Sequence, residues 1–350
     1  MSFKVCFVYP WATFGGVERI LLNRALAFKA SHANVEMSVL FLHDGGGLGS
    51  LREAIVAYDL KDYFRLTDSL IDRPYDLISL IDCPQALPLM RQHQLRYIVE
   101  CHTAYRENRS YLGALDSECE AVWVPGERFA DEIAKELPTT LAIQVMRNFV
   151  PWDVENSVVD LKYPMTGWKR RPLFFFGRMD AHKDPLALFD AFSLIEARCP
   201  GRFMLVLCGP ISPEIPIEKE LQRRKLRQHT VILPPIRFSH SSHLLRAIAE
   251  AGGIFVSPSR GESFGLSAAE AIAFGLPVVL SDIDAHSYLV DGSEVFLYPI
   301  GSASAMSEKI LAIANDYDQA LNNLLPLRRN LSSNAFLEDW DKAIQIVHSV

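Results

Sequence analysis

Short apolar runs alternate with amphipathic stretches along most of the chain. A helix is predicted over residues 17–29, because Val17, Ile20, Leu21, Ala25 and Phe28 recur at helical spacing. Apolar strands that alternate with helices are typical of a parallel sheet covered on both faces, which predicts an α/β fold. The strands predicted for the first half are 4–9, 35–42, 76–81, 97–101, 121–124 and 142–145.

The alternation breaks between residues 148 and 172, which are rich in proline, asparagine and basic side chains. We predict a linker at 151–172, an N-terminal domain over 1–150 and a C-terminal domain over 173–333. Ligands bind beyond the carboxyl ends of strands in open parallel sheets, so we expect a site in the cleft between the domains. The second half is predicted to hold strands at 173–176, 204–207, 231–233, 254–256 and 278–280 and helices at 185–196, 218–227, 243–250 and 263–274.

Composition narrows the class of protein. A chain of 350 residues exceeds what one hydrophobic core usually organises, which favours two domains. The net charge is −7 and no block of lysine and arginine stands out, so we expect no nucleic-acid partner. No apolar run is long enough to cross a bilayer, and the N-terminus has the pattern of a strand, not of an export signal. We therefore expect a cytoplasmic protein, for which peripheral membrane contact is neither signalled nor excluded.

The cysteines give no sign of a metal site or a disulfide framework. None of them forms a C-x-x-C pair, and several lie inside apolar runs, so we expect buried, reduced thiols. The six cysteines are at positions 6, 83, 101, 119, 199 and 208.

The strongest chemical signal lies in residues 257–279, where a predicted strand, a turn and a helix follow one another. The unpaired amides at a helix N-terminus favour anions, and Gly265 lets a phosphate approach the backbone. Glu270 lies in an otherwise apolar helix and needs a partner, because burying an unpaired charge is expensive. Eight residues of helix rise roughly 12 Å, about the reach from a donor hexose across a diphosphate to a ribose. Glu262 would then hold sugar hydroxyls and Glu270 the ribose diol; alternatively, Glu262 only favours the helix N-terminus and Glu270 pairs with a structural arginine.

A second signal is the pair of cations in the turn after strand 173–176. Arg178 and Lys183 are placed to stabilise a diphosphate leaving group, which gains charge as the glycosidic bond breaks. The alternative is two solvated cations in a loop.

Two further features follow strands in the N-terminal domain. Gly15 and Gly16 come after the first strand and allow a ligand close to the backbone, although a plain tight turn explains them as well. His102 follows the strand 97–101 and is placed to bind a substrate hydroxyl, although a lone histidine is more often structural. Residues 43–49, HDGGGLG, lack the ending of a P-loop, and we interpret them as a flexible loop near the cleft.

Together these residues resemble glycosyltransferase family 4, a retaining family with the GT-B fold of two Rossmann-like parallel-sheet domains facing across a cleft. Glu262 and Glu270 stand at the spacing of its E-x7-E motif, within P-S-x-x-E-S-F-G-L-x-x-x-E-A. Arg178 and Lys183 match its G-R-x4-K clamp. Gly15 and Gly16 match its G-G-x-E-R turn. The resemblance covers nearly the whole chain and is most specific over 173–280.

The resemblance implies further roles. It places the donor contacts at Ser263, Phe264, Gly265 and Leu266, with the base near the backbone of Ile236 and Arg237, and it makes His102 an active-site residue. Residues 147–150, Arg-Asn-Phe-Val, look like the family's N-G-V-D entry to the linker, with the glycine and the aspartate replaced. The helix at 334–350 corresponds to the closing helix that crosses back onto the N-terminal domain. The sequence departs from the family at Asp184, where glycine is usual, and at 252–253, where Gly-Gly replaces Ala-Asp.

The function that this resemblance implies is transfer of a sugar, with retention, from a nucleotide-diphosphate sugar to a hydroxyl of a glycan, a lipid-linked acceptor or a small molecule. His102, Glu262, Arg178 and Lys183 would be the catalytic residues. No metal or other cofactor is expected, because no D-x-D ends a strand at the cleft and the SDID of 281–284 lacks other carboxylates. The alternatives are a GT-B nucleotide-sugar epimerase and a non-catalytic protein that binds a nucleotide sugar.

Overall fold

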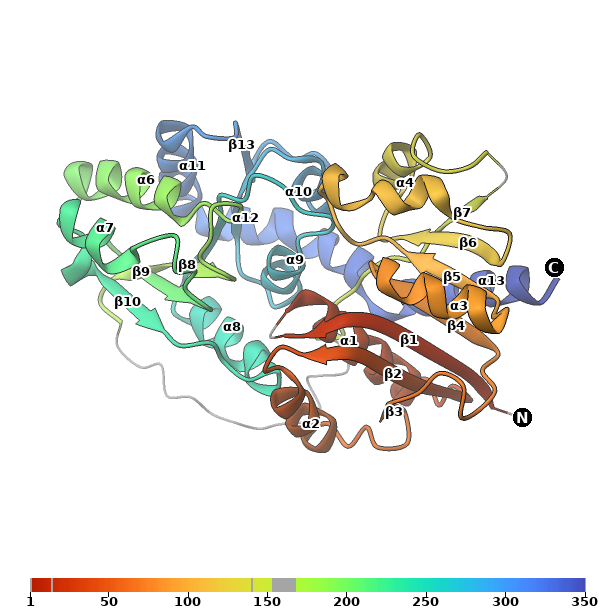
Figure 1. Ribbon diagram of the computed structural model, residues 1–350. Coiled ribbons are helices and arrows are strands. Elements are labelled where there is room, and N and C mark those ends of the chain that lie inside the picture. Colours follow the sequence, from red (N-terminus) through yellow and green to blue (C-terminus); the bar gives the residue numbers. More distant parts are fainter. Residues whose placement is uncertain (1, 14, 140, 153–167, 350) are drawn as a thin grey trace. The chain divides into compact units, whose positions relative to one another are not determined.

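The computed structural model describes residues 2–13, 15–139, 141–152 and 168–349 (Figure 1). It divides into two compact units, one formed by Met1–Val158 together with Ser332–Val350 and the other by Val159–Leu331. Most of the predicted linker, 153–167, lies outside the described residues.

The first unit is built on a parallel sheet with the strand order β3-β2-β1-β4-β5-β6-β7. This is the order of a doubly wound fold, in which the chain changes direction along the sheet between the first and fourth strands. Its strands are β1 (Phe3–Ala12), β2 (Val35–Asp44), β3 (Phe64–Leu66), β4 (Leu77–Ile81), β5 (Tyr97–Glu100), β6 (Cys119–Val124) and β7 (Ala142–Val145). Its helices are α1 (Gly16–Ala30), α2 (Leu48–Ala57), α3 (Leu87–His93), α4 (Glu127–Ile133) and α13 (Ser333–Ser349), with single turns at η1 (Pro84–Ala86), η2 (Arg106–Asn108) and η3 (Ser110–Ala114).

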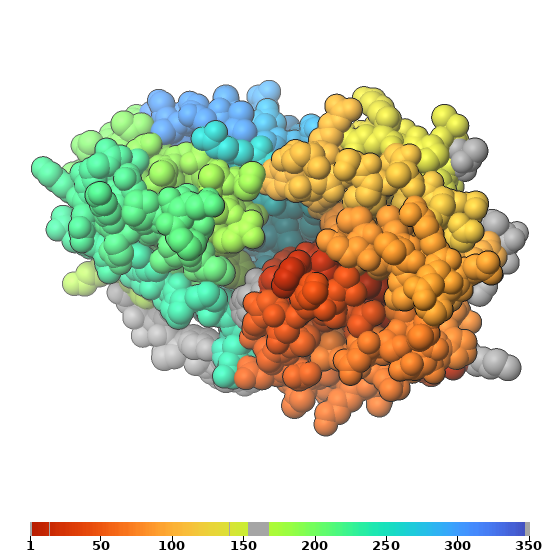
Figure 2. All heavy atoms as spheres, in the orientation of Figure 1, coloured from red at the N-terminus to blue at the C-terminus, as the bar shows by residue number. Residues whose placement is uncertain are grey.

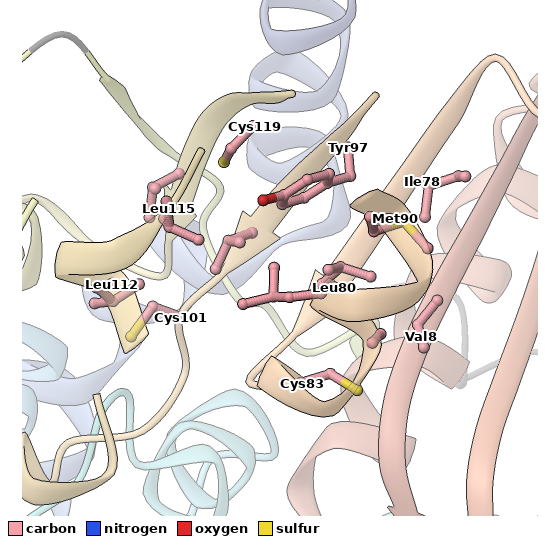
Figure 3. Packing of buried hydrophobic residues seen from close by; sticks show 14 of the residues in the cluster. Val8, Ile78, Leu80, Cys83, Met90, Tyr97, Cys101, Leu112, Leu115 and Cys119 are labelled. Atoms are coloured by element: carbon pink, nitrogen blue, oxygen red, sulfur yellow. The ribbon is translucent and has the colours of Figure 1, made fainter. Parts of the chain in front are cut away.

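Alternate residues of the central strand β1 face different helices, as the two-residue repeat of a strand requires. Cys6 and Val8 point into a cluster that includes Met90 of α3, whereas the ring of Phe3 meets that of Trp340 in α13. Figure 3 shows cysteines packed among the aliphatic side chains of this cluster. All six cysteines are free, and all but Cys199 are buried, which confirms the prediction of buried thiols for five of them. Burial raises the pKa of the Cys83 thiol to about 12, so this thiol is protonated and unreactive.

Helix α13 is fastened to the first unit by stacking and by an ion pair. The ring of Phe336 stacks on Phe149 with 4.7 Å between centroids. Arg147 forms a two-pronged contact with Asp339, at 2.6 Å from Nε to Oδ2 and 2.7 Å from Nη2 to Oδ1. Phe149 stands where the related family has glycine, so this departure supplies the ring on which the terminal helix stacks.

The second unit has the parallel strand order β10-β9-β8-β11-β12-β13, again that of a doubly wound fold. Its strands are β8 (Arg171–Phe176), β9 (Phe203–Cys208), β10 (Thr230–Leu233), β11 (Ile254–Ser257), β12 (Val278–Ser281) and β13 (Leu297–Tyr298). Its helices are α6 (Pro185–Arg198), α7 (Ile217–Arg223), α8 (Ser241–Glu250), α9 (Leu266–Ala273), α10 (Asp284–Leu289), α11 (Ala303–Asn315) and α12 (Tyr317–Leu324), with turns at η4 (Arg227–His229), η5 (Phe238–His240) and η6 (Leu325–Leu331).

The second departure from the related family, Gly252-Gly253, has a packing reason. Gly252 has a φ of +69°, and a Cβ added to Gly253 would lie only 2.7 Å from the carbonyl oxygen of Ile248. The carbonyl of Gly253 also accepts a hydrogen bond of 3.0 Å from the hydroxyl of Tyr317. The paired glycines therefore let the turn before β11 fold closely onto α8 and bind α12.

Candidate active site

Two loops that follow neighbouring strands of the second unit are joined to each other. One follows β8 and carries Lys183; the other follows β11 and carries Glu262. The Nζ of Lys183 forms an ion pair with the Oε1 of Glu262. The backbone N–H of Arg260 donates to the carbonyl of His182 at 2.8 Å. The structure thus brings together the cation of one sequence motif and the glutamate of the other, at the carboxyl edge of the sheet.

Asp180 organises the loop after β8, a role that the sequence analysis missed. Its Oδ1 accepts from the backbone N–H groups of His182 at 3.1 Å and Lys183 at 2.9 Å, and its Oδ2 pairs with the Nε of Arg178. Although partial burial raises the pKa of Asp180, the Lys183 N–H and the Arg178 guanidinium outweigh it and hold the pKa below its usual value. The side chain of Arg178 stays 64% exposed, so its guanidinium is anchored at one nitrogen and open to a ligand.

Asp184 stands where glycine is usual in the family, and its side chain makes contacts that glycine lacks. Its φ of +46° lies in the left-handed region, which favours glycine but tolerates aspartate. Its side chain caps α6 by accepting from the N–H of Ala187 at 3.3 Å. It also accepts from Arg260 at 2.9 Å from Nε and 2.8 Å from Nη2. This departure from the family therefore fastens the two loops together.

Glu262 is ionised in spite of its burial. Burial alone would raise its pKa, but the charge of Lys183 and hydrogen bonds with Lys183 and Ser259 outweigh that effect and lower the pKa. A buried carboxylate held this way is costly to leave without its partner. An anionic ligand that draws Lys183 away must therefore offer Glu262 other donors, and sugar hydroxyls are donors of this kind.

A buried histidine, His286, packs against the loop between β11 and α9, and the sequence analysis did not predict it. His286 in α10 is fully buried. Its Nδ1 lies 2.9 Å from the carbonyl oxygen of Ser281, and its Nε2 lies 3.3 Å from the hydroxyl of Ser257, so it ties together the ends of β11 and β12. Burial lowers the pKa of His286 to about 4, which makes the imidazole neutral near pH 7. The sequence could have indicated His286 by its position, because it lies five residues after the end of β12, at the carboxyl edge of the sheet.

Gly265 lies directly over this histidine. A Cβ there would come within 3.3 Å of His286 Cδ2 and of Leu289 Cδ1, and the φ of +83° places the residue in the left-handed region. For that reason α9 begins at Leu266 and not at Ser263, as the sequence predicted. The estimate of about 12 Å from Glu262 to Glu270 is therefore not valid as a helical rise, because residues 262–265 are not helical.

The first turn of α9 lies beside the loop that carries Lys183. A Cβ added to Gly177 would lie 3.9 Å from both Lys183 Cε and Ser267 Oγ. The helix amides that favour anions are therefore near a lysine. Glu270 is buried in α9 with 4% exposure, as expected.

The other residues predicted to contact the donor lie in loops at the carboxyl edge of the second sheet. Phe264 is buried at 5% exposure, and Ser263 lies in the loop before α9. Ile236, half-buried, and Arg237, exposed, follow β10 and precede η5. Because all these strands are parallel, their carboxyl ends lie along one edge of the sheet.

In the first unit, the glycine turn opens α1. Gly15 is the residue before the helix, and the carboxylate of Glu18 folds back to bind the backbone N–H of Thr13. A Cβ at Gly16 would meet nothing within 4 Å, so the fold does not demand glycine there. The loop at 43–49 is docked and not free: the N–H groups of Gly45 and Gly47 both donate to the carbonyl of Ala12, at 2.7 and 3.1 Å.

His102 follows β5 and lies above a buried carboxylate. Its Nε2 is 3.1 Å from Oε2 of Glu100, and its backbone N–H donates to both carboxylate oxygens of Asp82 at 3.1 Å. The Nδ2 of Asn148 is 3.5 Å from the other ring nitrogen. The side chain of His102 has 6% exposure, so it is covered apart from a small edge.

A cavity of about 720 Å³ opens elsewhere in the first unit, among residues that include Tyr75, Ile78, His93 and Glu120. It lies at the amino ends of β4, β5 and β6, and thus at the edge opposite His102. Its position does not match the carboxyl-end rule for ligand sites in such sheets.

Within the described residues, no group of three or more histidine, cysteine, aspartate or glutamate side chains is arranged to hold a metal ion. The same part of the chain contains no helix that is both long and apolar enough to cross a bilayer. Metal independence stays a prediction.

Comparison with known proteins identifies the second unit. Residues 170–316 match the family model described as glycosyl transferases group 1. The second unit belongs to the group 1 glycosyl transferases. This match covers the two joined loops, the first turn of α9 and the buried His286.

Two curated relatives share parts of the sequence. A GDP-mannose:cellobiosyl-diphosphopolyprenol alpha-mannosyltransferase of Xanthomonas oryzae pv. oryzae is 28% identical over 227 residues, 62% of this chain and 52% of the relative. A D-inositol 3-phosphate glycosyltransferase of Jonesia denitrificans is 34% identical over 117 residues, 32% of this chain and 27% of the relative. The chain therefore matches between about a quarter and about half of the length of these relatives.

A solved structure agrees in fold over nearly the whole chain. The Anabaena protein HepE in complex with UDP-glucose has a TM-score of 0.75 at 15% identity, with 98% of this chain and 99% of that chain covered. Likeness at this identity shows the fold alone. With two doubly wound parallel sheets, the chain has the GT-B fold that the sequence predicted.

Proposed function

We propose that this chain is a retaining, metal-independent glycosyltransferase that moves a sugar from a nucleotide-diphosphate sugar to a hydroxyl of an acceptor. The observation that carries the proposal is the Lys183–Glu262 pair beside the first turn of α9, within the segment that matches the family model. A cation, a carboxylate and helix amides are the groups that recognise phosphate and sugar together.

The diphosphate is the group that leaves, and its negative charge grows as the glycosidic bond breaks. Lys183, the exposed guanidinium of Arg178 and the amides around Leu266 would stabilise that charge more in the transition state than in the bound donor. Asp180 holds the two cations in place through the loop backbone and the Arg178 Nε.

The two glutamates have different proposed partners. Glu262 would accept from hydroxyls of the transferred sugar once Lys183 turns to the diphosphate. Glu270 would accept from the ribose diol, and the base would lie near the backbone of Ile236 and Arg237. Gly15, Gly16 and His102 of the first unit would contact the phosphates and the sugar.

This proposal does not assign the identity of the sugar donor or of the acceptor. HepE was solved with UDP-glucose, and the Xanthomonas relative is named for GDP-mannose, so the base and the sugar have to be found by a panel. The acceptor would be a glycan, a lipid-linked saccharide or a small-molecule hydroxyl. A thermal-shift screen of nucleotide sugars, followed by turnover with and without acceptors, tests the proposal: turnover without any acceptor would favour an epimerase, and binding without turnover a non-catalytic protein.

The groups that are present support retention. Inversion needs a general base opposite the leaving group, and double displacement needs a carboxylate beneath the anomeric carbon. Glu262 precedes the helix that binds phosphate and is engaged by Lys183, which suits neither role. We propose a front-face reaction in which the departing phosphate oxygen takes the acceptor proton. Proton NMR of the first product decides it: a β-linked product from an α-linked donor would overturn retention.

Two variants separate the donor contacts. Lys183→Ala should weaken binding of the nucleoside diphosphate by about 1.5–3 kcal/mol, the usual value of a charge-assisted hydrogen bond. Glu262→Gln should leave that affinity the same or higher, since it frees Lys183, while turnover falls. Titration calorimetry and steady-state rates measure both; equal losses of nucleotide affinity in the two variants would reverse the assignment.

Metal independence has its own test. Lysine, arginine and helix amides would take the place of Mg²⁺ at the diphosphate. Activity should survive EDTA, and loss of activity that Mg²⁺ or Mn²⁺ restores would contradict the proposal.

A further inference from the structure

A half-exposed tryptophan lies at the end of the central strand of the first unit, and the proposed function does not use it. Trp11 is the second-last residue of β1 and is 50% exposed, whereas Phe7 on the same strand is fully buried. An indole ring carries more apolar area than most side chains, so a fold gains stability when it covers the ring. This fold leaves half of Trp11 in solvent, which makes the ring a candidate contact for another molecule.

A stacked neighbour fixes the orientation of the Trp11 ring. Trp11 is opposite His43 in the register of β1 and β2, and the two ring centroids are 4.4 Å apart with an interplanar angle of 32°. Two residues earlier, on the same face of the strands, Tyr9 and Phe41 form an edge-to-face pair at 6.3 Å. The imidazole lies against one face of the indole, and no other ring of the described residues stacks on the opposite face.

The register of the sheet gives the position of Trp11 relative to His102. The pairings of β1 with β4 and of β4 with β5 place Tyr9 level with Glu100. Trp11 and His102 each come two residues later, at the same carboxyl edge and on the same face, because alternate residues of a strand share a face. Only β4 lies between β1 and β5. Since neighbouring strands are about 4.8 Å apart, the two positions are separated by roughly 10 Å.

The chemistry of the open indole face matches one class of ligand. Within the described residues, the Nε1–H of Trp11 forms no hydrogen bond, so it is available as a donor. A pyranose ring with mainly equatorial hydroxyls has two faces made of C–H groups and a polar edge. An aromatic ring can cover such a C–H face while its N–H donates to a hydroxyl at the edge.

We propose that Trp11, held by His43, is a platform for a pyranose ring of the acceptor, so that the acceptor is a saccharide. The inference rests on the proposed function, which already places the donor sugar at His102 and Glu262 and leaves the ring on Trp11 to the other substrate. A membrane surface is another common partner of exposed tryptophan, but it also attracts lysine and arginine. Residues 9–15 and 41–49 contain neither, and Asp44 beside His43 is exposed.

Binding is tested on the full chain without donor. Fluorine NMR of protein labelled with 5-fluorotryptophan resolves the five tryptophans, and Trp11 is assigned by the loss of its resonance in Trp11→Phe. Titration with cellobiose, maltose or methyl α-mannoside should shift the Trp11 resonance, and glycerol should not. Absence of a shift with every one of these pyranosides would overturn the inference. So would a shift with myo-inositol alone, or with anionic lipid vesicles alone.

The role in transfer is tested by graded variants at Trp11. Trp11→Ala should raise KM for a saccharide acceptor about tenfold and leave KM for the nucleotide sugar unchanged, because only the acceptor ring loses its contact. Trp11→Phe keeps an aromatic face and should raise the acceptor KM only about threefold. Ile71→Ala is the matched control, since Ile71 is an apolar residue of the same unit with 57% exposure and lies outside the proposed site. Both KM values should stay unchanged in this control.

The outcomes separate the two proposals. Absence of transfer with every donor and acceptor refutes the proposed function, and the NMR titration still decides whether Trp11 binds a pyranose. An acceptor KM that does not rise in Trp11→Ala, or a donor KM that rises equally, refutes the platform while the glycosyltransferase proposal stands. Thermal midpoints identify any variant that fails to fold, and Trp11→Phe, the smaller change, then carries the comparison.

Discussion

At the scale of single residues, the charge state of each buried group near the strand ends follows from one or two neighbours. Glu262 stays ionised because it is paired with Lys183. Glu100 stays ionised because it is paired with Arg24. His286 stays neutral because burial lowers its pKa by more than the nearby Glu262 carboxylate and the Ser281 carbonyl raise it. Two histidines near strand ends thus differ in their contacts: His102 lies against the buried carboxylate of Glu100, and His286 contacts Ser257 and Ser281.

Gly16 offers a test of ligand binding that separates it from folding. Gly16→Ala should leave the free energy of unfolding unchanged or raise it by about 0.5–1 kcal/mol, because a Cβ there meets nothing within 4 Å and alanine favours a helix. Binding of the nucleotide sugar should nevertheless fall, since the methyl group occupies the space of a ligand. Gly47→Ala is the control: its Cβ would overlap the Thr13 carbonyl, so it should destabilise by about 1–3 kcal/mol. Chemical denaturation and calorimetry measure the two effects, and unchanged affinity in Gly16→Ala would remove this turn from the site.

His286 should make stability depend on pH. Its pKa is about 4 in the folded chain and about 6.5 when exposed, so the unfolded chain binds a proton between these values and the folded chain does not. Stability is therefore full above pH 6.5 and falls as the pH drops from 6.5 to 4, by a total on the order of 3 kcal/mol. His286→Asn should be less stable at pH 7.5 but lose this contribution to the pH slope. Urea denaturation of both proteins at pH 7.5 and 5 measures it; equal slopes would show that His286 titrates normally.

At the scale of elements, the site depends on how helices begin. Helix α6 starts at a capping aspartate in the left-handed region, and α9 starts after a glycine in the same region. Both turns point backbone N–H groups toward the carboxyl edge of the sheet. Glycine suits the position before α9 for two reasons: its φ is +83°, and an added Cβ would lie only 3.3 Å from the ring of His286 in α10.

A pair of helix caps separates local stability from function. Asp184→Ala and Ser302→Ala should each cost about 0.5–2 kcal/mol, because each removes the side chain that caps α6 or α11. Asp184→Ala should also weaken nucleotide binding, since it frees Arg260 and loosens the loop that holds Lys183. Ser302→Ala should not, as its cap serves a different helix. Thermal midpoints and binding titrations distinguish them; equal binding in the two variants would show that Asp184 only caps.

The elements also show what the sequence could and could not predict. Long apolar strands and the glutamate and arginine–lysine motifs were recognisable, because period and spacing are local. Strands β3 and β13 were missed, since three and two residues carry too little pattern to detect. The early start assigned to α9 was wrong, because Gly265 has a φ of +83° and the helical spacing of side chains does not show where such a residue interrupts a helix. The contacts of His286 with Ser257 and of Glu100 with Arg24 join residues far apart in the chain. Asp180 was missed although its contacts lie within three residues, because the hydrogen bonds of a loop leave no periodic pattern in the sequence.

At the scale of the whole molecule, the two units are built separately, yet the chain returns at its end to the first of them. In Figure 2 the deepest red atoms, from the N-terminal segment, reach the surface of the first unit, where Trp11 at the end of β1 is 50% exposed. The C-terminal helix packs within the same unit, on Phe28 and Phe149. A segment more than 180 residues away in sequence thus completes the core that carries His102.

This return predicts that a change in the terminal helix acts on the first unit alone. Trp340 is 4% exposed and its ring meets those of Phe3, Phe28 and Trp123, so Trp340→Ala should cost about 3–5 kcal/mol. Hydrogen exchange followed by mass spectrometry should show lost protection in β1–β7 and unchanged protection in β8–β13. Phe192→Ala, at a fully buried position in the second unit, is the matched change and should give the reverse pattern. Because each sheet has its own core, the two losses should stay apart; protection lost equally in both units after either change would mean that they unfold as one cooperative body.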